Sequence, residues 1–356
     1  MTTIRKAIIT ATSIPPDPSN LIVAEAVLPP PSANEAQVRI LYAGFNGADV
    51  NMSRGTYPLQ RKAPLTPGYC LVGIVEIPPS TSSSSTTSGG FKKGDTVIAV
   101  TTYDAQAELA NVSERLLIKV PASLASHDAG LQQATAISLD WNTAWGMVAH
   151  AADVQPGQRV FIHGLSGAVG QGLVALSRLR GAEVYGTASP RNHNALRAQG
   201  VCEVWDYRNK EWVGEVVGRL GGMDVVFDPL GFESFDESWG VLRTGGILVG
   251  YGQNQGSLAG DHDARSPWWH VVKLMARGVV PFTGKRGTFY YIRPGTQAYR
   301  ERAAELMNML AAGEISVPIK AVWDLTTEGI REAHQSWGKI PGMGSLLIRV
   351  GTKRPA

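Results

Sequence analysis

The chain of 356 residues is longer than one hydrophobic core usually supports, so we expect two domains. Its 44% hydrophobic and 18% charged residues are typical of a globular protein, and a net charge of +3 argues against a nucleic-acid partner. With only Cys70 and Cys202, the chain offers no disulfide framework and no four-cysteine zinc lobe. No apolar run reaches the roughly 18 residues of a membrane span, and the first residues lack the apolar core of a signal peptide. We therefore expect a cytoplasmic protein with no membrane contact.

The first part of the chain, residues 1–128, reads as strands and turns. "QVRILYAGF" (37–45) and "DTVIAV" (95–100) are short runs rich in β-formers and bounded by turn residues, and no long helical period lies between them. The polar tract "PPSTSSSSTTSGG" (78–90) has too little apolar surface to join a core, so we expect a surface loop there. This part of the sequence predicts a mainly β domain.

From residue 129 onward, short apolar runs alternate with helical segments. The series begins with "RVFIHG" (159–164), and segments such as "GQGLVALSRLRG" (170–181) separate its members. That alternation is typical of βαβ units around a parallel sheet. A strand-like run "RGVVPF" (277–282), a helical stretch (297–315) and a final strand "SLLIRV" (345–350) follow. We predict a doubly wound α/β domain over 129–286, inserted into a mainly β domain made of 1–128 and 287–356.

The turn after the first strand of this series has two possible interpretations. It could present Ser166 as the nucleophile of a hydrolase, with Asp228 and His334 as its partners, but Ala168 stands where that motif needs glycine. It could instead cradle a dinucleotide, because a third glycine permits close helix–strand packing and a helix N-terminus offers N–H groups to an anion. We favour the dinucleotide. The expected contacts are backbone groups of Leu165, Ser166, Gly167, Ala168 and Val169, with Gly164 and Gly170 shaping the turn.

The end of the second strand predicts which dinucleotide binds. A cofactor with a free ribose 2′-hydroxyl usually meets Asp or Glu about 20 residues beyond the glycines. The corresponding stretch here, "GTASPRNHN" (186–194), contains no acidic residue. Ser189 and Arg191 can donate hydrogen bonds to a 2′-phosphate, and Tyr207 could close the same pocket, which favours NADPH. The alternative is an exposed polar turn that contains an arginine by chance.

The nicotinamide half of the cofactor should lie at the carboxyl edge of the sheet. Gly250, Gly252 and Gln253 stand at the end of the fifth strand of the series, so we place them there.

Three stretches together resemble the zinc-free quinone oxidoreductase and enoyl reductase branch of the medium-chain dehydrogenase/reductase superfamily. They are "GFNGADVNMSRGTYPLQRKAPLTPGY" (44–69), "TAWGMVAHAADVQPGQRVFIHGLSGAVG" (143–170) and "GSLLIRV" (344–350). The resemblance covers essentially the whole chain and implies a Rossmann domain inserted into a GroES-like catalytic domain, in a possible homodimer. "TASPRNHN" and "DYR" are similar to fungal trans-acting enoyl reductases, which implies a possible polyketide synthase partner.

The resemblance also implies catalytic residues. Tyr57 matches an active-site tyrosine, Asn46 an asparagine beside the nicotinamide, and Thr143 a threonine that faces the cofactor. Each also has a structural alternative. Tyr57 could simply pack as a loop aromatic, Asn46 could form a turn through its side-chain amide, and the Thr143 hydroxyl could lie on a helix face without a role. Asp49 is expected to begin or cap a short helical turn before Gly55 rather than to touch substrate.

Zinc-dependent relatives carry a cysteine in the loop that here holds Asn46, and a His-Glu pair where this chain has Tyr69 and Cys70. One soft ligand cannot hold a catalytic zinc, so we expect no metal and a buried, apolar Cys70. The Asp-His-Asp cluster at 261–263 is expected to be solvated. Trp268, Trp269 and His270 could line a substrate pocket, form a subunit interface or pack into the core.

Without a metal, the reaction that this constellation supports is hydride transfer onto an electron-poor carbon. We therefore predict an NADPH-dependent, zinc-independent oxidoreductase that reduces an activated C=C bond in a small-molecule enone or enoyl thioester. The alternatives are an NADPH:quinone oxidoreductase, a non-catalytic NADPH-binding protein of the same fold, and the serine hydrolase described above.

Overall fold

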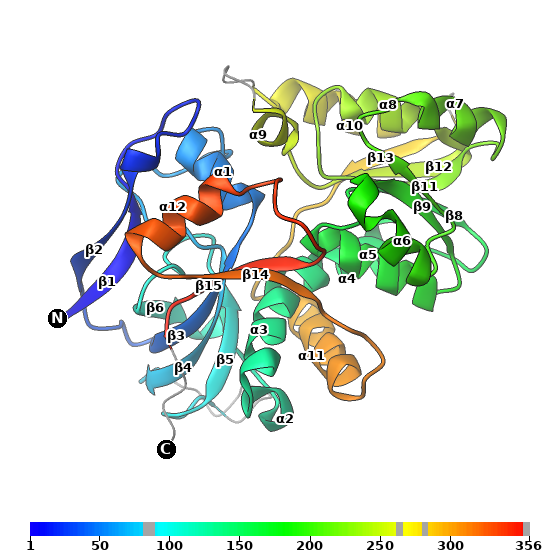
Figure 1. The fold of residues 1–356 in the computed structure, drawn as a ribbon. Helices are drawn as coiled ribbons and strands as arrows, with labels where there is room; N and C mark the ends of the chain where they lie inside the picture. Colours follow the sequence, from blue (N-terminus) through cyan, green and yellow to red (C-terminus); the bar gives the residue numbers. More distant parts are fainter. Residues whose placement is uncertain (81–89, 261–265, 280–283, 352–356) are drawn as a thin grey trace. The chain divides into compact units, whose positions relative to one another are not determined.

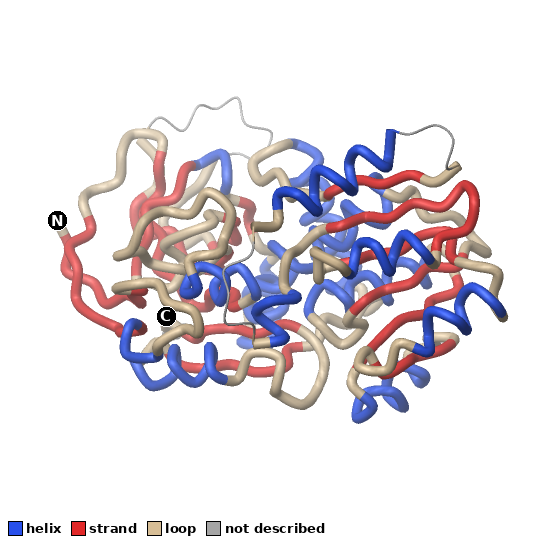
Figure 2. The backbone as a smooth tube through the Cα atoms, turned by 90° about the horizontal axis from the view of Figure 1, so that it is seen from above, coloured by secondary structure: helices blue, strands red, loops and turns tan. Residues whose placement is uncertain are grey.

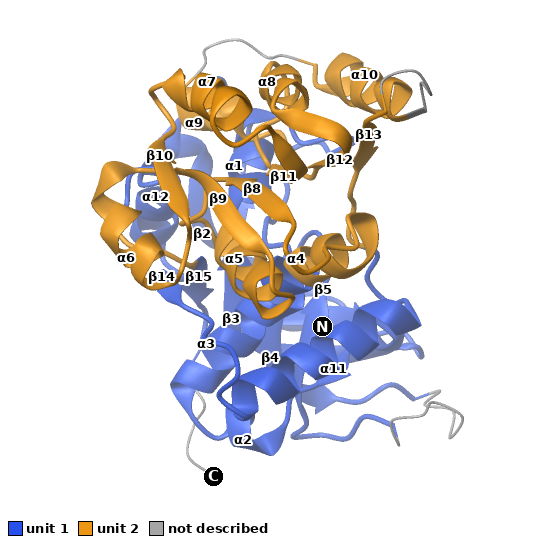
Figure 3. Ribbon diagram, turned by 90° about the vertical axis from the view of Figure 1, so that its right-hand side faces the viewer, with its two compact units in different colours: residues 1–142, 293–340, 345–356 blue, residues 143–292, 341–344 orange. Residues whose placement is uncertain are grey.

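The computed structural model describes residues 1–80, 90–260, 266–279 and 284–351. They form two compact units, coloured separately in Figure 3. The first unit comprises 1–142, 293–340 and 345–356, and the second comprises 143–292 and 341–344. The central residues of the polar tract (81–89) and the cluster at 261–263 lie outside the described residues. No helix in the described ranges has both the length and the apolar character that crossing a membrane requires.

The first unit is built mainly from strands (Figure 1). Its large sheet has the order β14-β15-β3-β4-β5-β7, with β6 also paired to β3, and β1 and β2 form a separate antiparallel pair. The strands are β1 (Thr2–Ile9), β2 (Leu21–Leu28), β3 (Glu35–Phe45), β4 (Cys70–Ile77), β5 (Thr96–Val100), β6 (Leu109–Ser113), β7 (Ile118–Lys119), β14 (Ile319–Asp324) and β15 (Ser345–Arg349). Because β15 pairs antiparallel with β3, the end of the chain returns to the first domain, as predicted.

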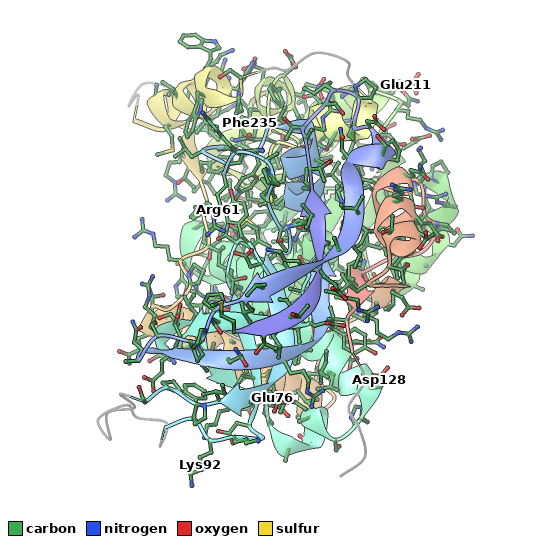
Figure 4. The ribbon with its side chains drawn as sticks, turned by 90° about the vertical axis from the view of Figure 1, so that its left-hand side faces the viewer. Arg61, Glu76, Lys92, Asp128, Glu211 and Phe235 are labelled. Carbon is green, nitrogen blue, oxygen red and sulfur yellow. The ribbon has the colours of Figure 1, made fainter. Side chains whose placement is uncertain are left out.

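The helices of the first unit pack around this sheet. They are α1 (Gly47–Arg54), α2 (Ala122–Ala125), α3 (Asp128–Ala136), α11 (Gln297–Ala311) and α12 (Thr327–Gln335). A π-helical turn (Ile137–Trp141) continues α3 and leads to α4 (Asn142–Gly146). The first residue of α3, Asp128 (labelled in Figure 4), accepts a hydrogen bond of 2.6 Å from the Tyr42 hydroxyl on β3. This bond ties the helix to the middle of the sheet.

The second unit contains a six-stranded parallel sheet of order β10-β9-β8-β11-β12-β13. Its strands are β8 (Arg159–His163), β9 (Glu183–Ala188), β10 (Glu203–Asp206), β11 (Met223–Asp228), β12 (Leu242–Gly250) and β13 (Arg286–Phe289), drawn in red in Figure 2. In chain order the pattern is 3-2-1-4-5-6, the order of a dinucleotide-binding Rossmann sheet, which reverses between β8 and β11. The predicted doubly wound domain is confirmed.

Helices cover both faces of this sheet. Figure 3 shows α5 (Ala168–Leu179) and α6 (His193–Ala198) on one face, and α7 (Glu211–Gly218), α8 (Ser234–Gly240) and α10 (Trp268–Val279) on the other. The last remaining helix is α9 (Gln255–Ala259), and a π-helical turn (Met147–Ala151) precedes β8. Trp212, Phe235 and Leu274 come from α7, α8 and α10 and meet Phe161 of β8 in one buried cluster. Burial of these large side chains supplies most of the driving force that holds the helices on the sheet.

The prediction of a strand at 277–282 is wrong for residues 277–279, which are the described part of that run. They belong to α10, and the sixth strand is β13 instead. These residues continue the helical spacing that begins at Trp268 and buries Leu274. At Gly278 a Cβ would lie 2.2 Å from the carbonyl oxygen of Gly287, so this glycine lets the helix pack directly on the strand.

Candidate active site

The glycine turn between β8 and α5 has the geometry of a phosphate cradle. Gly164 has φ +72°, a left-handed conformation, and nothing lies within 4 Å of where its Cβ would stand. A Cβ at Gly170 would lie 2.2 Å from the Gly164 carbonyl oxygen, so only glycine allows α5 to begin this close to the strand. Gly167 is the N-cap of α5 and makes no side-chain cap bond. The first N–H groups of α5 therefore have no intrahelical partner and suit an anion.

Residues 341–344, from the C-terminal part of the chain, are hydrogen-bonded to this turn. The Gly344 N–H donates to the carbonyl oxygen of Ser166 at 3.1 Å. Two residues earlier, the carbonyl oxygen of Gly342 accepts a bond of 3.4 Å from the Asn192 side chain. Residues 341–344 thus link the glycine turn to the turn that follows β9. This link brings the two expected phosphate-binding turns of the second unit together.

The turn that follows β9 places two of the expected 2′-phosphate ligands near solvent. Ser189 is half-buried and Arg191 is exposed. The side chain of His193 is occupied by a contact of 3.1 Å to the carbonyl oxygen of Ala188. Tyr207, after β10, is 51% exposed. The neighbouring Arg208 is bound by the Asp206 carboxylate, with distances of 2.7–3.1 Å, so its charge is already paired.

The carboxyl edge of the sheet is tied together by a buried polar network. The Asp228 carboxylate ends β11 and accepts hydrogen bonds from the Ser234 and Ser238 hydroxyls, both at 2.7 Å. Ser238 Oγ also lies 2.9 Å from His163 Nε2 at the end of β8, and burial lowers the pKa of that imidazole. Asp228 therefore has a structural role at the point where the strand order reverses.

The residues predicted for the nicotinamide half lie at the end of β12 and directly after it. A Cβ at Gly252 would lie 2.5 Å from the carbonyl oxygen of Pro229, so glycine is required by the close approach of the β11–α8 loop. A Cβ at Gly250 would lie 2.6 Å from the Phe235 ring. Gln253 is half-buried beside them. Thr143, the first residue of the second unit, is 9% exposed on α4.

In the first unit, Asn46 and Asp49 form a capping box at the start of α1. Asn46 Oδ1 accepts the Ala48 N–H at 2.8 Å, and Asp49 Oδ2 accepts the Asn46 N–H at 2.9 Å. The helix ends at Gly55, whose φ is +73°. The prediction that Asp49 caps a helix before Gly55 is confirmed. The Asn46 oxygen accepts the capping bond, so the side-chain NH₂ group, which the cap does not use, is the group that could donate a hydrogen bond to a ligand.

Asp49 also fixes the segment that leads into β4. Its Oδ1 accepts the Gly68 N–H at 2.8 Å and the Gln106 side-chain amide at 3.4 Å. The carboxyl group is fully buried, and this burial raises its pKa to about 7. The carboxylate therefore joins the start of α1 to the turn before β4.

Tyr57 lies just beyond α1 and is half-buried. Its hydroxyl is 3.2 Å from the hydroxyl of Tyr69, and the two rings meet edge to face with centroids 6.3 Å apart. The sequence alone identifies Tyr69 only as the residue that replaces a zinc ligand, and it does not predict this pairing. Its position directly after Pro67-Gly68 was the available signal.

Cys70, the next residue, is 2% exposed, as predicted. Burial raises the pKa of its thiol to about 12, which disfavours the thiolate that a metal would need. Within the described ranges, no group of three or more His, Cys, Asp or Glu side chains could hold a metal ion.

Comparison with known proteins identifies the family. Residues 32–138 match the model of the alcohol dehydrogenase GroES-like domain, and residues 199–339 match the model described as zinc-binding dehydrogenase. The chain is 30% identical over 233 residues to the quinone oxidoreductase of Sus scrofa, which covers 64% of this chain and 68% of that relative. The chain belongs to the medium-chain dehydrogenase/reductase superfamily.

Two solved structures share the fold of this medium-chain reductase along its length. Quinone oxidoreductase from Escherichia coli, complexed with NADPH, has a TM-score of 0.79 and 21% identity, and covers 98% of this chain and 100% of its own. The JamJ enoyl reductase has a TM-score of 0.78 and 21% identity, and covers 98% of this chain and 99% of its own. The chain thus has the fold of the quinone oxidoreductase and enoyl reductase branch, as predicted.

An NAD(P)-type cofactor fits the second unit of the reductase. The open space at Gly164 and the first N–H groups of α5, which have no partner within the helix, match a pyrophosphate. The hydrolase alternative fails on geometry. Both oxygens of Asp228 accept bonds from its own loop and from α8, while neither ring nitrogen of His334 has a partner among the described residues.

Trp268 and Trp269 do not pack into the core of the reductase. They are 51% and 68% exposed on α10, so that alternative is wrong. His270 is less exposed, and its ring lies edge to face with Phe232 at 5.5 Å.

Proposed function

We propose that this reductase uses NADPH, needs no zinc, and transfers hydride to an activated C=C bond of an enone or enoyl thioester. Two separate observations carry the proposal. The second unit has a glycine turn suited to phosphate and no acidic residue after β9, and the first unit has a phenol donor at Tyr57. The catalytic roles of Tyr57, Asn46 and Thr143 are part of the proposal.

The choice of NADPH rests on the turn after β9. Residues 186–194 carry no carboxylate to bind a ribose 2′-hydroxyl or repel a 2′-phosphate. Arg191 and the Ser189 hydroxyl supply donors near solvent, and the exposed Tyr207 ring adds a third. Arg208 is paired with Asp206 and is therefore not the residue that we assign to the phosphate.

The reaction requires charge stabilisation on the substrate oxygen. NADPH bound to the second unit would supply the hydride for the substrate β-carbon. The electron pair of the C=C bond then moves toward the carbonyl, which leaves an enolate oxygen to be stabilised and an α-carbon to be protonated by solvent. A phenol hydroxyl can donate a hydrogen bond, so Tyr57 can donate to that oxygen.

The residues of the first unit that occupy the positions of the zinc ligands are consistent with a reaction that uses no zinc. Asn46, Tyr69 and the buried Cys70 thiol replace the residues that the zinc-dependent relatives carry, and an uncharged thiol is a poor zinc ligand. An activated C=C bond is already electron-poor, so it accepts hydride without a Lewis acid.

A quinone is the second candidate substrate, favoured by the similarity to the quinone oxidoreductase of Sus scrofa. A quinone accepts hydride in the same way and also places negative charge on an oxygen that Tyr57 could stabilise. A protein that binds NADPH without catalysis is the remaining alternative, because a fold alone does not establish activity.

We further infer a homodimer. α10 exposes Trp268, Trp269 and Val272, each more than half accessible, and β13 beside it is an edge strand of the sheet. Exposed apolar side chains next to the outer edge of a sheet are typical of an interface. Light scattering should give the mass of two chains, and Trp269→Glu should give one. A polyketide synthase remains the other partner proposed, and a wild-type chain that runs as a monomer would favour it over the homodimer.

The test is a comparison of NADPH and NADH oxidation with simple enones, enoyl thioesters and quinones. Turnover of enones or thioesters with NADPH, unaffected by chelators, supports the proposal. Turnover of quinones alone favours the second candidate. Tight NADPH binding without any turnover favours the non-catalytic alternative, and stoichiometric zinc would contradict the zinc-independent reaction.

A further inference from the structure

The hydroxyl of Tyr57 is not an isolated donor. Tyr69 Oη lies 3.2 Å from Tyr57 Oη, and the rings are inclined by 73°. Tyr69 is 6% exposed, whereas Tyr57 is half-buried. The two phenols therefore form a chain that runs from the interior of the first unit toward its more accessible side.

Independent parts of the backbone hold the two phenols. The carbonyl oxygen of Tyr69 accepts the Thr101 N–H at 2.9 Å and the Thr102 N–H at 3.2 Å. On its other side, Gly68 has φ +104° and its N–H is bound by Asp49 at 2.8 Å. Tyr69 therefore has little freedom to move.

Tyr57 is fixed from α1 and the loop after it. Its N–H donates to the Asn51 carbonyl oxygen at 3.3 Å and to Gln60 Oε1 at 3.1 Å. The contact between the hydroxyls thus joins two separately anchored segments, which favours one defined orientation of Tyr57.

The order of donors in this chain matters for the reaction. A phenol hydroxyl has one proton to donate and oxygen lone pairs that accept. In the structure the Tyr57 hydroxyl donates to the Tyr69 hydroxyl at 3.2 Å. When Tyr57 donates its proton to a substrate oxygen instead, a lone pair of its oxygen can accept a bond from the Tyr69 hydroxyl, which is within hydrogen-bond distance. Hydrogen bonds in such a chain polarise one another, so donation by Tyr69 strengthens donation by Tyr57.

We propose that Tyr69 is a positioning residue for the reaction, and that its hydroxyl donates to Tyr57 as charge develops on the substrate oxygen. This inference rests on the proposed function, because it takes Tyr57 as the donor to substrate.

The experiment is a double-mutant cycle with Tyr57→Phe and Tyr69→Phe, which remove the hydroxyls and keep the rings. The readouts are kcat and KM with NADPH and an enone, the NADPH dissociation constant and the melting temperature. In the wild-type background, Tyr69→Phe should lower kcat about five-fold, the effect of one hydrogen bond, and leave NADPH affinity unchanged. In the Tyr57→Phe background it should change kcat less than about two-fold, because the hydroxyl it acts through is gone.

Tyr103→Phe is the matched control. It removes the hydroxyl of another half-buried tyrosine in the same unit, one that accepts the Arg61 N–H at 3.2 Å, and it should retain wild-type kcat.

The outcomes separate this inference from the proposed function. If Tyr57→Phe lowers kcat while Tyr69→Phe does not, only the inference is overturned. An equal loss from Tyr69→Phe in both backgrounds also overturns it, because that pattern marks a structural effect that is independent of Tyr57. If Tyr57→Phe is as active as the wild type, the proposed catalytic role of Tyr57 is wrong, and the inference about Tyr69 is then wrong too.

Discussion

Asp49 Oδ1 accepts the backbone N–H of Gly68 at 2.8 Å, across a sequence separation of 19 residues. The other oxygen of the same buried carboxyl group accepts the Asn46 N–H at 2.9 Å. One side chain thus fixes both the start of α1 and the turn that carries Tyr69. The segment in which we place the substrate-side hydrogen-bond donors depends on this carboxyl group for its geometry.

Asp49→Asn should lower the free energy of unfolding by about 1–2 kcal/mol at pH 5, because the asparagine NH₂ would face a backbone N–H. Burial raises the folded-state pKa of Asp49 from 3.8 to about 7. The folded protein therefore holds more protons than the unfolded chain between these pH values, and this group's contribution to stability falls as the pH rises from about 4 to about 7.

The difference between wild type and Asp49→Asn should consequently narrow from pH 5 to pH 8 in urea titrations. Asp104→Asn, an exposed carboxylate paired with Arg61, is the control and should show no such narrowing. A difference that widens with pH would contradict a raised pKa.

Gly170→Ala should destabilise the protein by about 1–3 kcal/mol and sharply weaken cofactor binding, because its Cβ would lie 2.2 Å from a carbonyl oxygen of the phosphate turn. Gly214→Ala is the matched control. It lies in α7 with no atom near its Cβ position, and should stabilise by about 0.5–1 kcal/mol. Thermal unfolding and NADPH titration of both variants measure the contrast. If the two variants bound NADPH with equal affinity, the glycine turn would not be part of the cofactor site.

Arg191→Ala should weaken NADPH binding by about ten-fold or more and change NADH binding little, since a hydrogen bond to a charged group contributes about 1.5–3 kcal/mol. Fluorescence titration with each cofactor measures both affinities. Arg208→Ala is the control, because that guanidinium already binds Asp206, and it should preserve the preference. An equal loss for both cofactors after Arg191→Ala would place the 2′-phosphate elsewhere.

His334→Phe should retain activity and make the protein more resistant to acid. Burial lowers the pKa of His334 from 6.5 to about 4, and neither ring nitrogen has a partner among the described residues. Its contribution to stability is therefore present above pH 6.5 and lost as the pH falls toward 4. A phenylalanine keeps the edge contact with Phe45, whose ring centroid is 5.0 Å away. Urea titrations at pH 7 and pH 5 should show the variant losing less stability than the wild type.

Much of the second unit could be predicted from local patterns. Each strand of the parallel sheet except the last is a short apolar run, and the glycine turn follows the first of them directly. The exception shows where such reasoning fails. Residues 277–279 contain a glycine and the β-branched Val279, and only the packing of α10 against β13 reveals that they continue a helix.

Some residues of the candidate site could also be predicted from local patterns, and others could not. Phosphate-binding turns are continuous in sequence, so their residues could be named before the structure was known. The Tyr57–Tyr69 pair could not be predicted, because two hydroxyls 12 residues apart meet only after α1 and the turn before β4 have been joined through Asp49.

The amino-acid sequence by itself determined the two-domain organisation, the glycine turn and the lack of an acidic residue after β9. These features are local, since they depend on backbone conformation, strand period and side-chain chemistry within a few residues. Only the tertiary structure decided that the buried Asp49 carboxyl group joins α1 to the turn before β4, and that the Tyr69 hydroxyl lies within hydrogen-bond distance of Tyr57. It also decided that Asp228 is bound by its own loop and α8 and does not serve a catalytic histidine. Those relationships arise from side chains distant in sequence, whose burial and hydrogen bonding exist only once each unit has folded.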